Sequence, residues 1–237
     1  SVNRYTLIPR PETELLVEHA LQVIEDRPST IEKKKQMLSH YPRSSNINPR
    51  IAVIDVGTGS GCIIVSLIKS LQSSTIHHPA STSFFATDIS KRALDVAKKN
   101  AQRHGVAQQI TFVQSELLKK LDKPLQKFDE IIILANLPYL SEKLYFTTDS
   151  TVRNFEPKKA LLSGQDGLDH YRELLAALHT LSPGRKVHFF LEISPEQAKI
   201  FPPLLASLGV TQTRILQDLS QPDRLVIGSW EPRQPTR

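Results

Sequence analysis

Cysteine is almost absent from this sequence of 237 residues, which contains only Cys62. A lone cysteine excludes a disulfide framework and fits a reducing compartment. Long apolar runs are also lacking. No stretch approaches the roughly 18 apolar residues of a membrane-spanning helix, and the first residues lack the apolar segment of a signal peptide. We therefore expect a cytoplasmic protein that does not associate with a membrane.

Aromatic residues make up only 6% of the chain, and basic residues outnumber acidic ones, which leaves a net charge of +6. Part of the excess is local, since residues 27–50 contain Lys33–Lys35, Arg43 and Arg50 but one acid, Glu32. Aromatic residues do not alternate regularly with these bases, so a stacking platform for single strands is not supported. We expect an exposed insertion at 27–50 and no stable nucleic-acid binding.

The first functional signal is a buried strand that ends in a polar corner. The apolar run from Ile131 to Ala135 is typical of a strand covered on both faces of a parallel sheet. It ends at Asn136-Leu137-Pro138-Tyr139, where the proline cannot donate to a strand ladder. An amide and an aromatic ring are thus expected at the carboxyl end of a strand, the edge where open α/β sheets bind ligands.

A glycine-rich turn follows another buried strand, Ile51–Val56. Gly57-Thr58-Gly59-Ser60-Gly61 leads directly into an apolar helix from Cys62 to Leu71. The spacing is not that of the dinucleotide-binding fingerprint, and no Gly-Lys-Ser/Thr follows as in a P-loop. Glycines let a ligand approach the backbone closely, and the helix amino end offers free N–H groups. The turn resembles motif I of class I methyltransferases that use S-adenosylmethionine.

Two further strand ends carry acids. The strand Ser83–Asp88 ends in an acid where nucleotide-binding sheets hold ribose hydroxyls, although Asp88 could instead cap the helix that follows, for which Ser90 is the expected N-cap. A third strand, Gln109–Gln114, leads to Glu116 and Leu117. In the fold of the class I methyltransferases that the glycine turn resembles, that corner lies beside the adenine of the cofactor.

The remaining pattern predicts a doubly wound α/β fold with a mostly parallel seven-stranded sheet and an antiparallel last strand pair. Helices are expected at Glu12–Asp26, about Ile31–Leu38, Ser90–Gly105, Leu168–Leu181 and Pro195–Leu208. A long loop is expected at Tyr139–Gly167. The last strands are expected at Val187–Ile193, Val210–Leu216 and Arg224–Trp230. The pair His77-His78 has no acid or cysteine at ligand spacing, so no metal site is expected.

Together these segments resemble the release factor glutamine methyltransferases, the HemK or PrmC family. The resemblance covers nearly the whole chain. The blocks that carry it are Leu7–Glu14, Asp55–Cys62, Ala86–Ser90, Asn136–Tyr139 and Gly164–Arg172, followed by Glu192-Ile193 and Gln197. We therefore expect one methyltransferase domain over residues 1–237. Only six residues precede the first block, so the family's leading helical domain is expected to be absent.

The resemblance implies methyl transfer from S-adenosylmethionine to the glutamine amide of a Gly-Gly-Gln motif in a peptide chain release factor. It also implies site residues. The implied catalytic residues are Asn136, Leu137, Pro138 and Tyr139, which with Arg10 would also bind the substrate. The implied cofactor-binding residues are Gly57, Thr58, Gly59, Ser60, Gly61, Asp88, Glu116, Leu117 and Asn136. Arg10, Pro11 and Thr13 would line the entry side. We expect a monomer.

Two departures from the family pattern keep alternatives open. Leu137 stands where the family has a proline, and the resulting Asn-Leu-Pro-Tyr also resembles ribosomal RNA adenine dimethyltransferases. An N6-adenine methyltransferase acting on RNA or DNA is therefore the first alternative. Glu116 stands where an aspartate is usual. A degenerate methyltransferase fold kept as a binding module is the second alternative, which the altered tetrapeptide and the expected absence of the leading helical domain leave open.

Overall fold

The computed structural model describes residues 1–3, 5–10, 13–25, 49–74, 82–148, 157–181, 183–210, 212–218, 220 and 222–231. Several sequence predictions fall on other residues. Pro11, the helix expected at Ile31–Leu38, the pair His77-His78 and most of the insertion expected at 27–50 lie outside the described residues.

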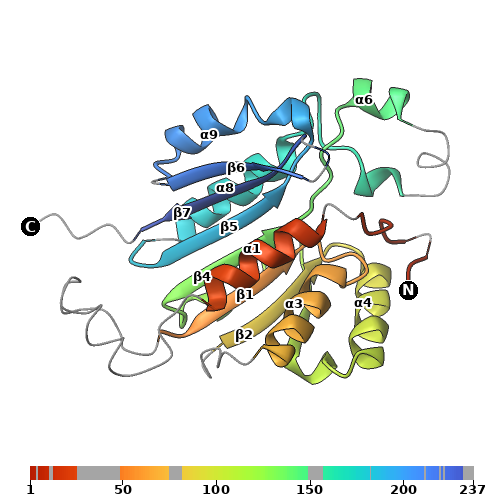
Figure 1. The fold of residues 1–237 in the computed structure, drawn as a ribbon, viewed down its shortest axis with the longest axis vertical. Coiled ribbons are helices and arrows are strands. Elements are labelled where there is room, and N and C mark those ends of the chain that lie inside the picture. The colour runs from red at the N-terminus through yellow and green to blue at the C-terminus, as the bar shows by residue number, and fades with distance from the viewer. Residues whose placement is uncertain are drawn as a thin grey trace, which may run out of the picture.

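A seven-stranded sheet forms the centre of the fold, with strand order β3-β2-β1-β4-β5-β7-β6 (Figure 1). The first five strands pair in parallel, and β7 pairs antiparallel with both β5 and β6. This confirms the predicted fold class. The strands are β1 Ile51–Val56, β2 Thr82–Asp88, β3 Ile110–Gln114, β4 Glu130–Ala135, β5 Lys186–Glu192, β6 Gln212–Gln217 and β7 Asp223–Trp230.

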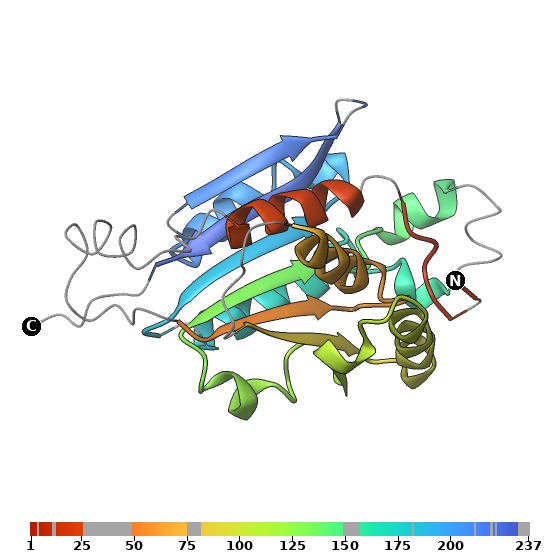
Figure 2. The same ribbon diagram turned by 60° about the horizontal axis from the view of Figure 1, so that its bottom comes forward.

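The two central strands, β1 and β4, are buried along their whole length, as their apolar sequences predict. Successive side chains of a strand point to opposite faces, so each strand contributes to two cores. Ile51 and Val53 pack in one apolar cluster, whereas Ala52 and Ile54 pack in the other. Helices cover both faces of the sheet (Figure 2).

One face of the sheet is covered by α1 Thr13–Glu25, α3 Cys62–Ser73 and α4 Lys91–Arg103 (Figure 1). The other is covered by α8 Asp169–Leu181 and α9 Phe201–Ser207. Short elements join them: α5 Asp122–Leu125, α6 Glu142–Thr147, and 3-10 turns at Ala107–Gln109, Lys158–Ala160 and Pro195–Gln197. None of the helices in the described ranges is long and apolar enough to cross a bilayer.

Two predictions of local structure were wrong. The helix expected at Pro195–Leu208 is a 3-10 turn, Pro195–Gln197, and a separate helix that begins at Phe201. Pro202 and Pro203 lack the N–H groups that would continue a helix from the turn, but they fit the first turn of a new one. The loop expected after Tyr139 contains α6, whose N-cap is Ser141.

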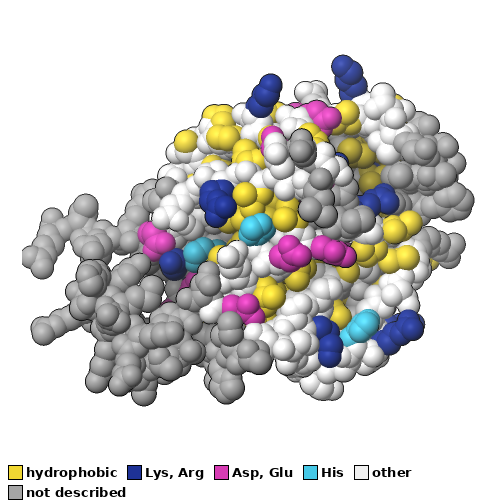
Figure 3. Space-filling view, in the orientation of Figure 1, with side chains coloured by type: hydrophobic (Ala, Val, Ile, Leu, Met, Phe, Trp, Pro, Cys, Tyr) yellow, Lys and Arg dark blue, Asp and Glu magenta, His cyan; other side chains and the backbone are white. Residues whose placement is uncertain are grey.

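Lysine and arginine side chains on the face over α1 are scattered and do not form a patch among the side chains described there (Figure 3). The net charge of +6 is therefore not concentrated over this part of the sheet.

Candidate active site

The strand register gathers the predicted site residues along one edge of the sheet. Val56 lies opposite both Thr87 and Ala135, and Asp88 lies opposite Gln114. The residues that follow these strands therefore start from neighbouring positions. This places the glycine turn between Asp88 and Asn136, at the carboxyl edge where ligands bind in such sheets.

The glycine turn is held by backbone hydrogen bonds to the neighbouring strand. The Thr58 N–H donates to the Thr87 carbonyl oxygen at 2.8 Å, and the Gly59 N–H donates to Asp88 Oδ2 at 2.9 Å. Among the described residues, a β carbon on Gly59 would meet only the Gly57 carbonyl oxygen, 3.9 Å away, so no described side chain fills the space beside this backbone. A β carbon on Gly61 would instead lie 3.0 Å from Ala97 Cβ, so protein fills that side.

The Asp88 carboxylate joins the glycine turn to the beginning of α4. Its Oδ2 accepts the Gly59 N–H, and its Oδ1 accepts the Ser90 N–H at 2.8 Å. Ser90 is the N-cap, as predicted, because its hydroxyl oxygen accepts the Ala93 N–H. Burial raises the pKa of Asp88, and these two hydrogen bonds oppose that rise. Each carboxylate oxygen retains a further lone pair that could accept a ligand hydroxyl.

The corner after β3 lies beside Asp88, because the Ser115 N–H donates to the Asp88 carbonyl oxygen at 3.0 Å. Glu116 is exposed, and its carboxylate accepts from Lys119 Nζ at 2.7 Å. Leu117 has a positive φ of 47°, unusual for a residue with a side chain, and packs against the core on the α8 side of the sheet. The unusual backbone of Leu117 turns the chain at this edge.

Asn136 takes part in a chain of side-chain hydrogen bonds at the opposite side of the glycine turn. Its Nδ2 donates to Thr13 Oγ1 at 3.4 Å, and Thr13 Oγ1 donates to Glu192 Oε2 at 2.8 Å. Asn136 Oδ1 is buried and accepts no hydrogen bond from any described residue. Unsatisfied buried acceptors are rare and costly, so this oxygen is suited to a ligand N–H.

Arg10 and Pro11 were predicted beside Thr13 on the entry side. Arg10 is half-buried, and its carbonyl oxygen accepts the Thr13 N–H at 3.1 Å where α1 begins. Arg10 is thus three residues from a side chain that contacts Asn136. Pro11 lies outside the described residues.

Comparison with known proteins identifies the family. Residues 47–164 match the family model described as a methyltransferase domain. The chain is 35% identical over 227 residues to the release factor glutamine methyltransferase of Rhodopirellula baltica. The aligned region covers 95% of this chain and 67% of that protein. It is 36% identical to the protein of the same name from Enterococcus faecalis, over 95% of this chain and 69% of that one. The chain belongs to the release factor glutamine methyltransferase family.

Two more comparisons concern a curated relative and a solved structure. A bifunctional methyltransferase of Rickettsia typhi is 34% identical over 95% of this chain, which spans 40% of that protein. The solved catalytic domain of hMettl16 in complex with the MAT2A 3′UTR hairpin 6 has a TM-score of 0.62 at 17% identity, over 100% of this chain and 76% of that one. The latter likeness concerns the fold alone. As a methyltransferase of this family, the protein uses S-adenosylmethionine as its methyl donor.

The structure fits that cofactor at the glycine turn. The Gly59 backbone, which no described side chain covers, lies in one row with the carboxylate of Asp88 and the corner at Glu116 along the sheet edge. These groups provide close backbone approach, an acceptor for hydroxyls and an acceptor for an amine, which are the groups a nucleoside ligand requires. Their roles in binding stay predictions.

Leu137, the departure from the family pattern, makes a hydrogen bond that proline could not. Its backbone N–H donates to Tyr171 Oη at 3.3 Å, and Tyr171 Oη donates to the Glu192 carbonyl oxygen. The Leu137 side chain is buried against the turn, where a β carbon on Gly57 would lie 2.8 Å from Leu137 Cδ2. The hydrogen bond to Tyr171 restrains a backbone that the missing proline ring no longer fixes.

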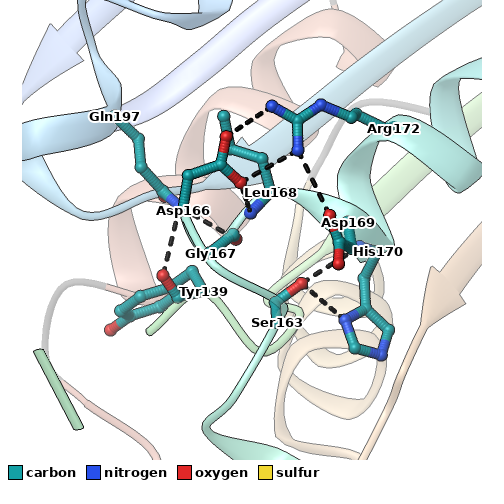
Figure 4. A network of polar contacts seen from close by, with 9 residues as sticks. All are labelled: Tyr139, Ser163, Asp166, Gly167, Leu168, Asp169, His170, Arg172 and Gln197. Atoms are coloured by element: carbon teal, nitrogen blue, oxygen red, sulfur yellow. Dashed lines mark hydrogen bonds and ion pairs between the residues drawn. The ribbon is translucent and has the colours of Figure 1, made fainter. Parts of the chain in front are cut away.

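The family block Gly164–Arg172 supports the segment that follows Pro138. Gln197 Nε2 donates to the carbonyl oxygens of Tyr139, at 3.1 Å, and Gly167, at 2.9 Å (Figure 4). Gly167 has φ of 80°, and a β carbon there would lie 2.1 Å from the Tyr139 carbonyl oxygen. Only glycine permits this approach. Arg172 pairs with Asp166 in the same network, which fixes the loop ahead of α8.

Sequence reasoning missed the roles of four residues that shape this site. Glu192 and Gln197 entered only through the family resemblance, Tyr171 had no role, and Thr13 was placed only at the entry side. One signal could have found Glu192, since it is an acid at the end of the mostly apolar segment Val187–Leu191 and therefore at the same sheet edge. Gln197 and Tyr171 carry no such signal, because their partners are distant in sequence.

Asp55 lies beneath the glycine turn and makes folding dependent on pH. Its Oδ2 accepts the Thr58 hydroxyl at 2.6 Å and the Ile64 N–H at 3.3 Å. Burial raises its pKa from 3.8 to about 7 in spite of these bonds. Between these values the folded protein retains a proton that the unfolded chain has lost. Its contribution to stability is thus complete below about pH 4 and is lost as the pH rises through 7.

Asp55→Asn is therefore expected to remove part of the pH dependence of stability. In the parent protein the contribution of Asp55 to the free energy of unfolding should fall by up to about 4 kcal/mol from pH 4 to pH 8, at roughly 1.4 kcal/mol per pKa unit. Urea unfolding at several pH values measures this. The variant should gain stability relative to the parent as the pH rises, whereas the exposed control Asp95→Asn should not. Parallel curves for Asp55→Asn and the parent would contradict the assignment.

Proposed function

We propose that this protein methylates the side-chain amide nitrogen of the glutamine in the Gly-Gly-Gln motif of a peptide chain release factor. The names of its relatives support this substrate. One observation in the site carries the proposal: Asn136 Oδ1 is a buried acceptor without a partner among the described residues, next to the glycine turn. A planar NH2 group has N–H bonds that would satisfy it.

The chemical difficulty is that an amide nitrogen is a poor nucleophile, because its lone pair is delocalised into the carbonyl. Asn136 is not a base, and neither are its neighbours Leu137 and Pro138. Positioning must therefore supply most of the acceleration. Asn136 Oδ1 and the Leu137 carbonyl oxygen each accept one N–H of the substrate amide in this mechanism. The two bonds hold the nitrogen in place and increase its electron density.

The other residues of the corner complete the binding of the amide. Pro138 restricts the backbone torsion, and Tyr139 covers one face of the planar group. When bound, S-adenosylmethionine supplies an electrophilic methyl group on a positively charged sulfonium, and that charge is lost during transfer. The buried Leu137 side chain makes the corner apolar, which disfavours the charged reactants more than the transition state. The surplus proton passes to water after transfer.

Mass spectrometry of a release factor after incubation with the protein and S-adenosylmethionine tests the proposal. We expect one added methyl group on the tryptic peptide that contains Gly-Gly-Gln. A release factor with Gly-Gly-Ala in its place is the matched control and should stay unmodified. Methylation of an offered RNA oligomer but not of the release factor would instead support the adenine alternative. If no methylation occurs and S-adenosylmethionine causes no thermal shift, the binding-module alternative would be supported.

The expectations about the partner, the oligomeric state and the location belong to the same proposal. The partner is the release factor itself, as substrate. A monomeric state and a cytoplasmic location stay predictions.

A further inference from the structure

The side-chain amide of Asn136 could lie in either of two orientations, and only one of them serves the proposed reaction. An amide oxygen accepts an N–H, whereas an amide NH2 can only donate. If the two ends were exchanged, Asn136 would direct its own N–H groups at the substrate NH2, and neither group could accept. Some feature of the protein must therefore determine which end of the Asn136 amide faces the site.

The hydroxyl of Thr13 lies between the Asn136 amide and a carboxylate. Thr13 Oγ1 is 2.8 Å from Glu192 Oε2 and 3.4 Å from Asn136 Nδ2. Thr13 is 6% exposed and Glu192 is 3% exposed, so water does not compete for these bonds. A short bond to a buried carboxylate is the strongest that this hydroxyl can form.

The number of available protons fixes the direction of each hydrogen bond that links Asn136, Thr13 and Glu192. A carboxylate only accepts, so the single hydroxyl proton of Thr13 goes to Glu192. The Thr13 oxygen then has only lone pairs left for Asn136, and it must meet the NH2 end of that amide. Asn136 Oδ1 is consequently turned away from Thr13, in agreement with its lack of a partner in the described part of the chain.

Three separate elements bring these side chains together. Thr13 is the first residue of α1, and Asn136 and Glu192 lie at the ends of the paired strands β4 and β5, where Ala135 is opposite Leu191. The backbone of Glu192 supports the same corner. Its carbonyl oxygen accepts from Tyr171 Oη, which accepts the Leu137 N–H. Glu192 thus restrains Asn136 through its side chain and Leu137 through its backbone.

We infer that Thr13 and Glu192 are positioning residues that set the orientation of the Asn136 amide. The inference rests on the proposed role of Asn136 Oδ1 as acceptor of the substrate N–H. Neither residue touches the reacting atoms in this scheme. Their effect is to make the productive orientation the only one in which the Asn136 amide can form a hydrogen bond with Thr13.

Thr13→Val and Thr13→Ser form the deciding pair of variants. Valine matches threonine in shape but has no hydroxyl, so either amide orientation becomes available. Serine retains the hydroxyl. We expect kcat for release-factor methylation to fall about tenfold to a hundredfold in Thr13→Val, and to stay within about threefold of the parent in Thr13→Ser. The affinity for S-adenosylmethionine, measured by calorimetry, should change less than about threefold in both, since positioning of Asn136 affects transfer more than cofactor binding.

A spectroscopic readout tests orientation without activity. In protein labelled with 15N-asparagine, the side-chain NH2 signals of Asn136 are identified by their loss in Asn136→Ala. They should shift in Thr13→Val and stay near their parent positions in Thr13→Ser. Thr6→Val removes another buried hydroxyl, one that bonds to Asn3 and not to Asn136. That control should leave both kcat and the Asn136 signals unchanged.

A double-mutant cycle tests Glu192. If Glu192 acts on Asn136 through Thr13, Glu192→Met should lower kcat in the parent but cost little more in the Thr13→Val background. Equal losses in both backgrounds would overturn the linkage. Unchanged kcat in Thr13→Val, with Asn136→Ala inactive, would overturn the inference but retain the proposed function. Near-parent activity of Asn136→Ala would overturn the proposed mechanism itself.

Discussion

Asn136→Ala is expected to lower the rate of methyl transfer by at least a hundredfold, and by up to about a thousandfold, while S-adenosylmethionine binds nearly as before. The variant removes the buried Oδ1 acceptor, which has no other partner among the described residues. Loss of one preorganised polar group in a site costs about this much when it acts on the transition state. Single-turnover transfer of a labelled methyl group to a release factor measures the rate, and calorimetry measures cofactor affinity.

The matched control for this variant is Asn3→Ala, at an exposed asparagine far along the chain from the corner. It should transfer methyl groups at the parent rate. Methylation by Asn136→Ala within a few-fold of the parent rate would show that Asn136 Oδ1 is not needed to hold the substrate amide, and the mechanism would fail. An equal loss of cofactor affinity would assign Asn136 to cofactor binding instead.

Asp88→Ala is expected to weaken S-adenosylmethionine binding about tenfold to a hundredfold. Hydrogen bonds to a charged acceptor contribute about 1.5–3 kcal/mol each, and a factor of ten in affinity corresponds to about 1.4 kcal/mol. Asp88 has two candidate effects. It would accept ribose hydroxyls, and it also holds the glycine turn through the Gly59 N–H. Calorimetric titration of parent and variant measures the loss.

A ligand that lacks the ribose hydroxyls separates these two effects of Asp88. S-adenosylhomocysteine and its 2′,3′-dideoxy analogue are titrated into the parent and into Asp88→Ala. If Asp88 binds the ribose, removing the hydroxyls costs affinity in the parent but little more in the variant. If Asp88 acts only through the turn, the two losses add, and the ribose assignment is wrong.

Local patterns were enough to predict most of the fold. The strand Ile51–Val56 agrees with the structure at both ends, and the helix after Gly61 begins at Cys62 as expected. Apolar runs buried on both faces, glycines with positive φ and the N-cap at Ser90 are all properties of a few neighbouring residues. The order of such units in the chain implies a doubly wound sheet, which brings the strand ends together.

The two wrong predictions of local structure concern segments in which the neighbouring residues were compatible with more than one structure. Pro202 and Pro203 were compatible both with an interrupted helix and with the first turn of a new one, and the structure has the latter. The polar segment after Tyr139 contained the N-cap signal of Ser141, but a helix of six residues is too short for a recognisable apolar stripe.

The sequence by itself thus determined which strand ends carry Gly59, Asp88 and Asn136, because strand period, turns and chain order are set by neighbouring residues. Only the tertiary structure decided how those groups are held. The direction of the Asn136 amide depends on Thr13, 123 positions before it, and on Glu192, 56 positions after it. Thr13 and Glu192 are themselves 179 positions apart. No local pattern encodes such contacts, since they exist only after α1, β4 and β5 have packed together.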